Sequence, residues 1–279
     1  MLQRKSLEEA VAALGAATDL VAAARELLVI GDLVGLPQPA VIDDYSTSRV
    51  LTVEDGRAIA SVLGWEDDFQ RAWLDQRLYL LSPIAAVCRV TTRPFAWDAA
   101  EVARVVREAR HRPRVSWNMT PENGIHGGIT VPIHMPRART GSVGWLARSP
   151  DVDIPAKLEQ YGSALRLAAM HMMDLIHAKR VEAAEPVLPA EALNERELEC
   201  LTWAGLGLTD ADIGRMIHRS PATSRFHLDN AVAKLGARNR TQAVAMAAQL
   251  GLVHPLDDEG VAERGEERGR NRKTGESAS

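Results

Sequence analysis

The sequence lacks the features that mark a membrane protein or a secreted protein. No stretch approaches the roughly 18 consecutive apolar residues that a membrane helix requires, so we expect no membrane association. The two cysteines, Cys88 and Cys200, lie far apart outside any pairing motif, which predicts reduced core thiols in a cytoplasmic protein. Glu8 and Glu9 stand where an export signal would have its apolar centre, and this argues against export.

Motifs for catalysis, cofactors and metals are also missing. The sequence has no nucleophile elbow, P-loop or dinucleotide-binding fingerprint. His126 and His134 lie on an expected hairpin without metal-ligand spacing. His171 and His177 share an expected helix, but at six residues apart they point to different faces. We therefore predict no enzyme, no metal and no cofactor.

The chain also lacks a strong charge of either sign. Its 33 basic and 37 acidic residues give a net charge of −4, so any DNA contact must come from a local basic face. The apolar fraction of 46% is typical of an ordinary globular protein. A length of 279 residues is long for one domain and sufficient for two.

Helical and strand-like patterns alternate over residues 1–180, the expected first domain. Apolar residues at helical spacing predict a helix over residues 6–30, with Gly31 as its stop. Strands enclosed by helices predict an α/β/α layered domain. The expected elements are strands over 40–46 and 57–65, a following helix with Phe69 and Trp73, a helix over 98–110, paired strands over 127–135 and 141–148, and a long amphipathic helix over 156–180.

The composition changes after residue 180. Residues 181–190 are rich in proline, small residues and glutamate, which indicates a linker. Residues 191–254 show only helical pattern with breaks at glycine and proline, which predicts four short helices. The charged residues 255–279 have almost nothing to bury, so we expect a disordered tail. The expected class is therefore α+β, with an all-α second domain.

Two of the four short helices have strong start signals. Thr209 can cap a helix over residues 210–217, and Ser220 can cap a second helix with Pro221 at its first position. Two short helices joined by such a turn have the proportions of a helix-turn-helix, whose second helix lies in the major groove of DNA. The pattern leaves a plain four-helix bundle with a charged surface as the alternative.

The second of these helices carries residues suited to DNA. Arg225 would project from its first turns, and arginine is the commonest specific partner of guanine. Other hydroxyls and cations suit phosphate contacts, although nearby aspartates partly offset the positive charge. The candidate DNA-binding residues are Ser220, Thr223, Ser224, Arg225, His227, Lys234, Arg238 and Arg240.

Residues 193–253, from "LNERELECL" to "AMAAQLGLV", resemble the LuxR-type helix-turn-helix through nearly their whole length. The shared features include Arg196–Glu197, Phe226–His227 and Asn239–Arg240. Two residues depart from the family pattern. Ser224 stands where the family usually has Val, and Leu208 stands where it commonly has Lys, which implies one phosphate contact fewer. The resemblance implies binding to double-stranded DNA through a recognition helix.

The motifs "FQRAW", "LLSPIA", "RPFAW" and "GIHGGITVPIH" occur in an order similar to the autoinducer-binding domain of quorum-sensing LuxR regulators. The resemblance covers roughly residues 36–180. It implies an α/β/α sandwich that binds an acyl-homoserine lactone between sheet and helices, with the helix over 156–180 in dimer contacts. A phosphoacceptor receiver domain, with Asp43–Asp44 as its acidic cluster, does not fit the order of elements.

Alignment to this family changes the polar residues of the ligand site. The conserved tryptophan of the family falls on Phe69, its tyrosine on Trp73, and the aspartate that accepts the ligand amide hydrogen on Ser82. Phe69 has no donor and Ser82 is a neutral acceptor, so a standard acyl-homoserine lactone should bind poorly. The candidate ligand-binding residues are Trp65, Phe69, Trp73, Ser82, Trp97 and Thr130. The aromatic stripe at helical spacing also fits a plain core.

The sequence thus predicts a cytoplasmic, homodimeric transcription regulator that responds to a small diffusible signal molecule. One alternative is a ligand-independent regulator whose first domain only dimerises, with itself or with a related partner. A third is an enzyme fused to a DNA-binding module, although no base or orienting carboxylate is visible beside Ser82. The sequence leaves open the ligand, the operator and the sign of regulation.

Overall fold

The computed structural model describes residues 5–66, 82–108, 119–182 and 193–253. These residues form two compact units, one mainly before residue 185 and one after it. The first combines a sheet with helices, and the second contains only helices. The expected α+β class is confirmed.

The first unit is built on a four-stranded antiparallel sheet with the strand order β1-β4-β3-β2. Strand β1 spans Gln38–Ile42, β2 Phe95–Asp98, β3 Gly127–Met135 and β4 Arg139–Ala147. The predicted pairing of residues 127–135 with 141–148 is confirmed, and it puts Thr130 opposite Gly144. Because side chains alternate along a strand, Ile129, Val131 and Trp145 point to one face of the sheet and Thr130 to the other.

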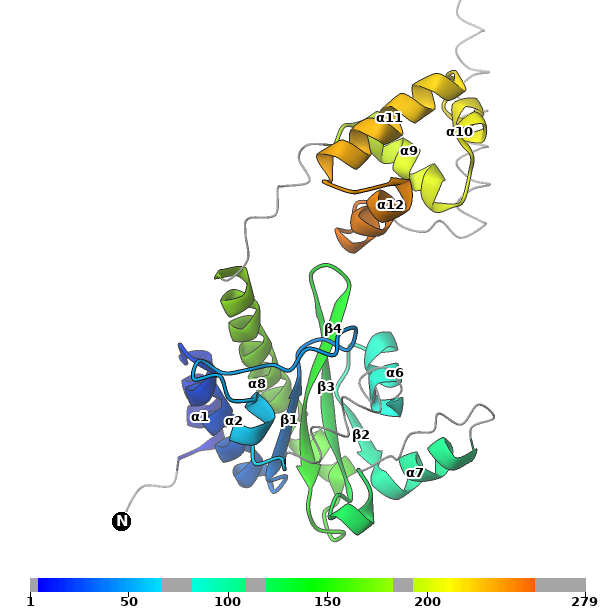
Figure 1. Cartoon of the computed structure of the whole chain (residues 1–279). Coiled ribbons are helices and arrows are strands. Elements are labelled where there is room, and N and C mark those ends of the chain that lie inside the picture. The colour runs from blue at the N-terminus through cyan, green and yellow to red at the C-terminus, as the bar shows by residue number, and fades with distance from the viewer. Residues whose placement is uncertain (1–4, 67–81, 109–118, 183–192, 254–279) are drawn as a thin grey trace, which may run out of the picture. The chain divides into compact units, whose positions relative to one another are not determined.

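Three helices cover the face that carries Trp145 (Figure 1). They are α1 (Leu7–Gly15), α2 (Leu20–Val34) and α8 (Ile154–Glu182). Trp145 is fully buried, and its Nε1 donates to the carbonyl oxygen of Leu27 in α2 at 3.2 Å. The opposite face packs against α6 (Pro83–Val90), with α3 (Ile59–Val62) and α7 (Ala99–Glu108) nearby in the same unit. The expected α/β/α layering is confirmed.

Two sequence-based expectations for the first helices of this unit are wrong. The helix predicted over residues 6–30 is two helices, because Asp19 caps a new start by accepting the amide hydrogen of Ala22 at 2.7 Å. Gly31 does not stop the second helix; it lies inside α2, where an added Cβ would meet the carbonyl oxygen of Leu36 at 2.7 Å. Gly35, with φ 75°, ends the helix instead.

Residues 57–65 were expected as a strand, but Ile59–Val62 form the short helix α3. A brief apolar run has no decisive periodicity, so local sequence could not separate the two states. The only strand-like feature in this stretch is a bridge between Thr52 and Ala58. Phe69 and Trp73, with the helix predicted to carry them, lie outside the described residues.

The second unit contains the four predicted short helices. They are α9 (Glu195–Gly205), α10 (Asp210–Met216), α11 (Pro221–Lys234) and α12 (Arg240–Gln249). Each begins at a residue whose side chain accepts a backbone amide hydrogen, and the expected caps Thr209 and Ser220 are confirmed. Their small core includes Cys200, Leu201, Trp203, Ile213, Ile217 and Leu228.

Candidate functional site

A cavity lies on the face of the sheet that carries Thr130. The space open to the centre of a water molecule is about 130 Å³. Four of the six predicted ligand-binding residues, Trp65, Ser82, Trp97 and Thr130, line this cavity. Strand β2 places Trp97 and strand β3 places Thr130, whereas Ser82 caps α6 and Trp65 follows α3. Residues that are distant in sequence therefore meet around one space.

The indole donors at the cavity are already used by the protein. Nε1 of Trp97 donates to Oγ1 of Thr130 at 3.0 Å, and Nε1 of Trp65 donates to the carbonyl oxygen of Pro39 at 2.7 Å. The hydroxyl of Thr130 keeps its own hydrogen, which it can donate to another acceptor. The hydroxyl of Thr130 can thus donate to a ligand, whereas the indole N–H groups of Trp65 and Trp97 are already engaged.

Ser82 occupies a position with a structural role. Its side chain is 1% exposed, and Oγ accepts the amide hydrogen of Ala85 at 3.4 Å as the N-cap of α6. Pro83 follows at the first helical position. Because Oγ is the acceptor in this cap, the hydroxyl hydrogen of Ser82 is not used by it. Ser82 therefore offers the cavity a neutral donor.

A pair of hydroxyls in the cavity wall was not predicted from the sequence. Tyr45 and Ser142 are 3% and 4% exposed, and their oxygens lie 2.6 Å apart. Burial raises the pKa of Tyr45 well above its ordinary value, and it raises the pKa of the neighbouring Cys88 thiol to about 11. All three groups are therefore neutral near pH 7. Alternation along β4 would have placed Ser142 on this face, but no local pattern predicts the position of Tyr45.

Two aspartates also line the cavity, and both have partners. Asp43 forms an ion pair with Arg180 in the last turn of α8. Desolvation raises the pKa of Asp43, and the charge of Arg180 offsets part of this rise. Oδ1 of Asp44 accepts from the backbone nitrogen and the hydroxyl of Ser46 at 2.8 and 2.6 Å. Both carboxylates of the cavity wall are thus already engaged by protein groups.

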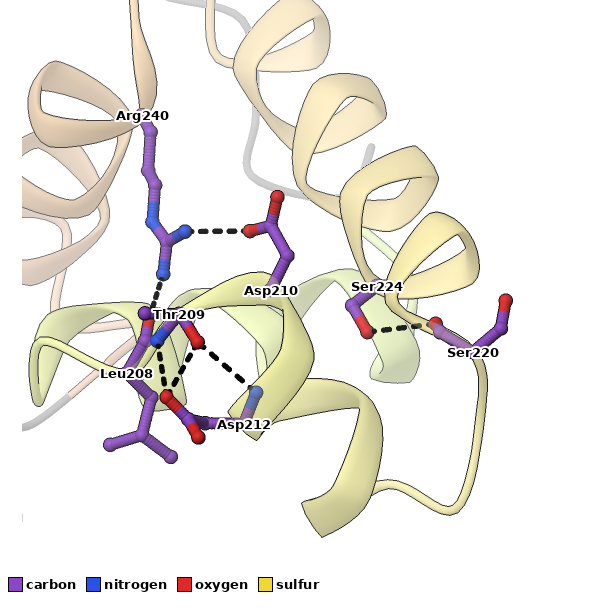
Figure 2. A network of polar contacts seen from close by, with 7 residues as sticks. All are labelled: Leu208, Thr209, Asp210, Asp212, Ser220, Ser224 and Arg240. Atoms are coloured by element: carbon purple, nitrogen blue, oxygen red, sulfur yellow. Dashed lines mark hydrogen bonds and ion pairs between the residues drawn. The ribbon is translucent and has the colours of Figure 1, made fainter.

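The second unit has the geometry of a helix-turn-helix in α10 and α11. The two helices pack closely at Gly214, where an added Cβ would lie 3.1 Å from Oγ of Ser224 in α11 and 2.8 Å from the carbonyl oxygen of Arg219 in the turn. Ser224 is completely buried here, and its hydroxyl donates to the carbonyl oxygen of Ser220 at 3.2 Å (Figure 2). The expectation that Ser224 contacts DNA is therefore wrong, because its side chain belongs to the packing between the helices.

Two of the expected phosphate-binding cations cross-link helices in this structure. Nζ of Lys234 lies 2.8 Å from Oε2 of Glu197, a side chain that is only 1% exposed. Arg240 binds Asp210 at 2.7 Å, and its other terminal nitrogen donates to the carbonyl oxygen of Leu208 (Figure 2). Both residues thus hold the fold of this unit together.

The remaining expected residues lie on or beside the outer face of α11. Arg225 and Arg238 are exposed, and within the described chain neither guanidinium pairs with a carboxylate. Thr223 and His227 are half-buried, and Oγ1 of Thr223 lies 2.9 Å from Oγ of the exposed Ser220. On α11, Arg225 is thus exposed without a carboxylate partner in the described chain, whereas Lys234 is paired with Glu197.

The described residues show neither a metal site nor a membrane-spanning helix. Among the described residues, no group of three or more His, Cys, Asp or Glu side chains could hold a metal ion. No helix in the described ranges has the length and apolar character needed to cross a membrane.

The two units match two family descriptions. Residues 42–175 match the autoinducer binding domain, and residues 191–247 match the bacterial regulatory proteins of the luxR family. Transcriptional activator protein BjaR1 of Bradyrhizobium diazoefficiens is 31% identical over 175 residues, 62% of this chain and 67% of that protein. The HTH-type quorum sensing-dependent transcriptional regulator RpaR of Rhodopseudomonas palustris is 28% identical over 192 residues, 68% and 73% of the two chains.

A solved structure shows the same fold. The crystal structure of Escherichia coli SdiA aligns with 91% of this chain and 93% of its own, with a TM-score of 0.51 and 16% identity. The curated relatives are named as transcriptional regulators. The cavity, the helix-turn-helix and these matches lead to one conclusion: the chain belongs to the LuxR family of quorum-sensing transcriptional regulators.

Proposed function

We propose that this regulator responds to a small neutral signal molecule other than a standard acyl-homoserine lactone. The observation that carries the proposal is Ser82, a neutral and buried helix cap at the position of the family carboxylate. A charged hydrogen-bond partner in a buried site contributes about 1.5–3 kcal/mol, which corresponds to roughly one to two decades of affinity. The hydroxyl of Thr130, and the one hydroxyl hydrogen that the Tyr45–Ser142 pair leaves free, instead favour a ligand with neutral acceptors such as carbonyl or ether oxygens.

We further propose that the regulator acts as a homodimer on double-stranded DNA, in the cytoplasm where that DNA lies. Leu167 and Met170 are each 45% exposed on one side of α8. Apolar residues at this spacing on a long helix suit the matching helix of a second copy. A dimer would space two recognition helices for a two-fold-symmetric operator, and the ligand would act by stabilising it. Arg225 would read guanine, with Ser220, Thr223 and Arg238 near the phosphates.

The ligand proposal is tested by changing Ser82. Asp and Asn are both good helix caps, so Ser82→Asp and Ser82→Asn keep the start of α6 and differ in charge. Mass spectrometry of small molecules extracted from the purified chain identifies what the natural cavity holds. Thermal-shift measurements with N-octanoyl-homoserine lactone then compare the three proteins, since saturation at 100 times Kd adds about 2.7 kcal/mol of stability.

We expect little stabilisation of the unchanged protein and the largest stabilisation of the Ser82→Asp variant, with the Asn variant as the matched control. Adding Phe69→Trp and Trp73→Tyr to Ser82→Asp should improve lactone binding further. Nanomolar binding of the lactone by the unchanged protein would contradict the proposal. If no extract contains a ligand and no variant responds, the first domain serves dimerisation without a signal.

A further inference from the structure

The recognition helix exposes one large apolar side chain. Phe226 is 61% exposed, and among the large hydrophobic residues of the described range 193–253 it is the exposed one. A single exposed apolar residue carries little information by itself, because most protein surfaces contain some. The position of Phe226 on the outer face of α11 indicates a functional role.

Phe226 lies at the centre of the outer face of α11. The exposed residues of this helix include Ala222, Arg225, Phe226, Asp229 and Ala233, which share one side at helical spacing. Their opposite side, with Ser224, Leu228 and Ala231, is buried in the unit. Because Ala222 and Ala233 are short, Arg225 and Phe226 extend furthest from this face.

The ring of Phe226 also contacts the ring of its neighbour His227. Its centroid lies 5.7 Å from that of His227 with an angle of 65° between the planes, an edge-to-face contact. His227 is half-buried, so it supports the ring from the protein side.

The apolar ring on this face of α11 suits one chemical group of DNA, the methyl group of thymine. In the major groove, thymine alone presents a methyl group, and apolar side chains contact it. Phe226 has no hydrogen-bonding group, so against the polar edge of another base it would leave donors or acceptors unpaired. We propose that Phe226 reads the C5-methyl group of a thymine in the half-site that Arg225 also contacts. This inference rests on the proposed role of α11 as the reading helix.

The test uses the full chain and a duplex that it selects from a random-sequence library. Each thymine is replaced in turn by deoxyuridine, symmetrically in both half-sites, which removes the methyl group and leaves the hydrogen-bonding edge unchanged. For the unchanged protein, one thymine position should show about a fourfold loss of affinity per half-site on this replacement. For Phe226→Ala, affinity for the thymine duplex should fall, and the thymine and deoxyuridine duplexes should bind equally.

Two further variants separate the roles of neighbouring residues. Phe226→Leu keeps an apolar side chain and should retain part of the preference for thymine. Arg225→Ala should bind more weakly yet keep the full thymine preference at the same position. Because Phe226 is exposed, its replacement should leave the core of the unit intact, and an unchanged thermal midpoint verifies this.

The outcomes are distinct. Full thymine preference in Phe226→Ala, or no methyl-sensitive thymine in the unchanged protein, would overturn the inference. If Phe226→Ala binds DNA as tightly as the unchanged protein, the ring belongs to a protein contact and the inference is wrong. If the chain selects no specific sequence, the proposed reading role of α11 fails first, and this inference fails with it.

Discussion

Replacing Lys234 by Met should destabilise the DNA-binding unit before it changes any contact with DNA. Lys234 lies 2.8 Å from Glu197, whose side chain is 1% exposed, while the side chain of Lys234 is 37% exposed. Removing one partner of a buried ion pair costs about 3–5 kcal/mol, because the other charge is left buried and unpaired. Water reaches the Lys234 end, and Glu197 still accepts the amide hydrogen of Asn194 at 2.8 Å. We therefore expect a smaller cost, about 2–3 kcal/mol.

Hydrogen exchange of the amides in α9 and α11 measures this cost within the full chain, separately from the first unit. Glu197→Gln added to Lys234→Met should restore most of the protection, since Gln can replace Glu in a capping box. Arg238→Met is the matched control: Arg238 is exposed and pairs with no carboxylate in the described chain. It should leave protection unchanged and reduce the salt slope of DNA binding by about 0.9 per half-site contact.

The reasoning would be refuted if Lys234→Met left the protection of α9 and α11 unchanged and instead reduced the salt slope as Arg238→Met does. Lys234 would then be a phosphate-binding residue, as the sequence predicts, and its ion pair with Glu197 would contribute little. Loss of protection that the double variant does not restore would indicate that the stem of Lys234, not its charge, matters.

The remaining predictions concern assembly and the two thiols. Leu167→Glu should shift the chain from dimer to monomer in sedimentation velocity, whereas Glu159→Gln on an exposed part of α8 should not; an unchanged dimer would exclude this side of the helix. Cys88 and Cys200 should resist iodoacetamide at pH 8 in the native protein and react after unfolding, because burial raises both pKa values to about 11 and leaves about one thiolate in a thousand. Since both folded pKa values exceed the ordinary 9.0, the thiols support the fold fully below pH 9, and this contribution is lost as pH rises through about 11. Rapid labelling of either native thiol at pH 8 would contradict that account.

Local signals predicted the elements whose ends are set by local chemistry. Thr209 and Ser220 start helices because their side chains satisfy amide hydrogens a few residues away, and this depends on neighbouring residues alone. The strand pair β3–β4 followed from alternation and a short connection. The strand prediction for residues 57–65 was wrong because a short apolar run suits either a strand or a helical turn, and only tertiary packing decides between them.

The sequence predicted a helix-turn-helix surface for DNA, but it did not identify each residue that is free to contact DNA. Family position and charge suggested Lys234 and Arg240, yet tertiary contacts with Glu197 and Asp210 engage both cations. Ser224 sits among candidate contacts in sequence, but the close approach of α10 at Gly214 buries it. Phe226 was recognised as a family feature and overlooked as a contact, because hydrophobic pattern assigns an apolar residue to the core. Its exposure becomes visible only when the face of α11 is known.

The cavity illustrates why the rest could not be predicted. Ser82, Trp97 and Thr130 were found through family motifs, but their present hydrogen bonds depend on β2 lying beside β3 and on the start of α6. Tyr45 and Ser142 are 97 residues apart and meet because β1 pairs with β4 and the amide of Tyr45 donates to the carbonyl oxygen of Thr140 at 2.8 Å. Their hydroxyls add a neutral hydrogen-bond donor, whereas the family site uses a negatively charged carboxylate acceptor. The polar lining of this cavity therefore arises from the register of the sheet, which puts the hydroxyls of Thr130 and Ser142 on one face, in the same cavity wall as the carboxylates of Asp43 and Asp44.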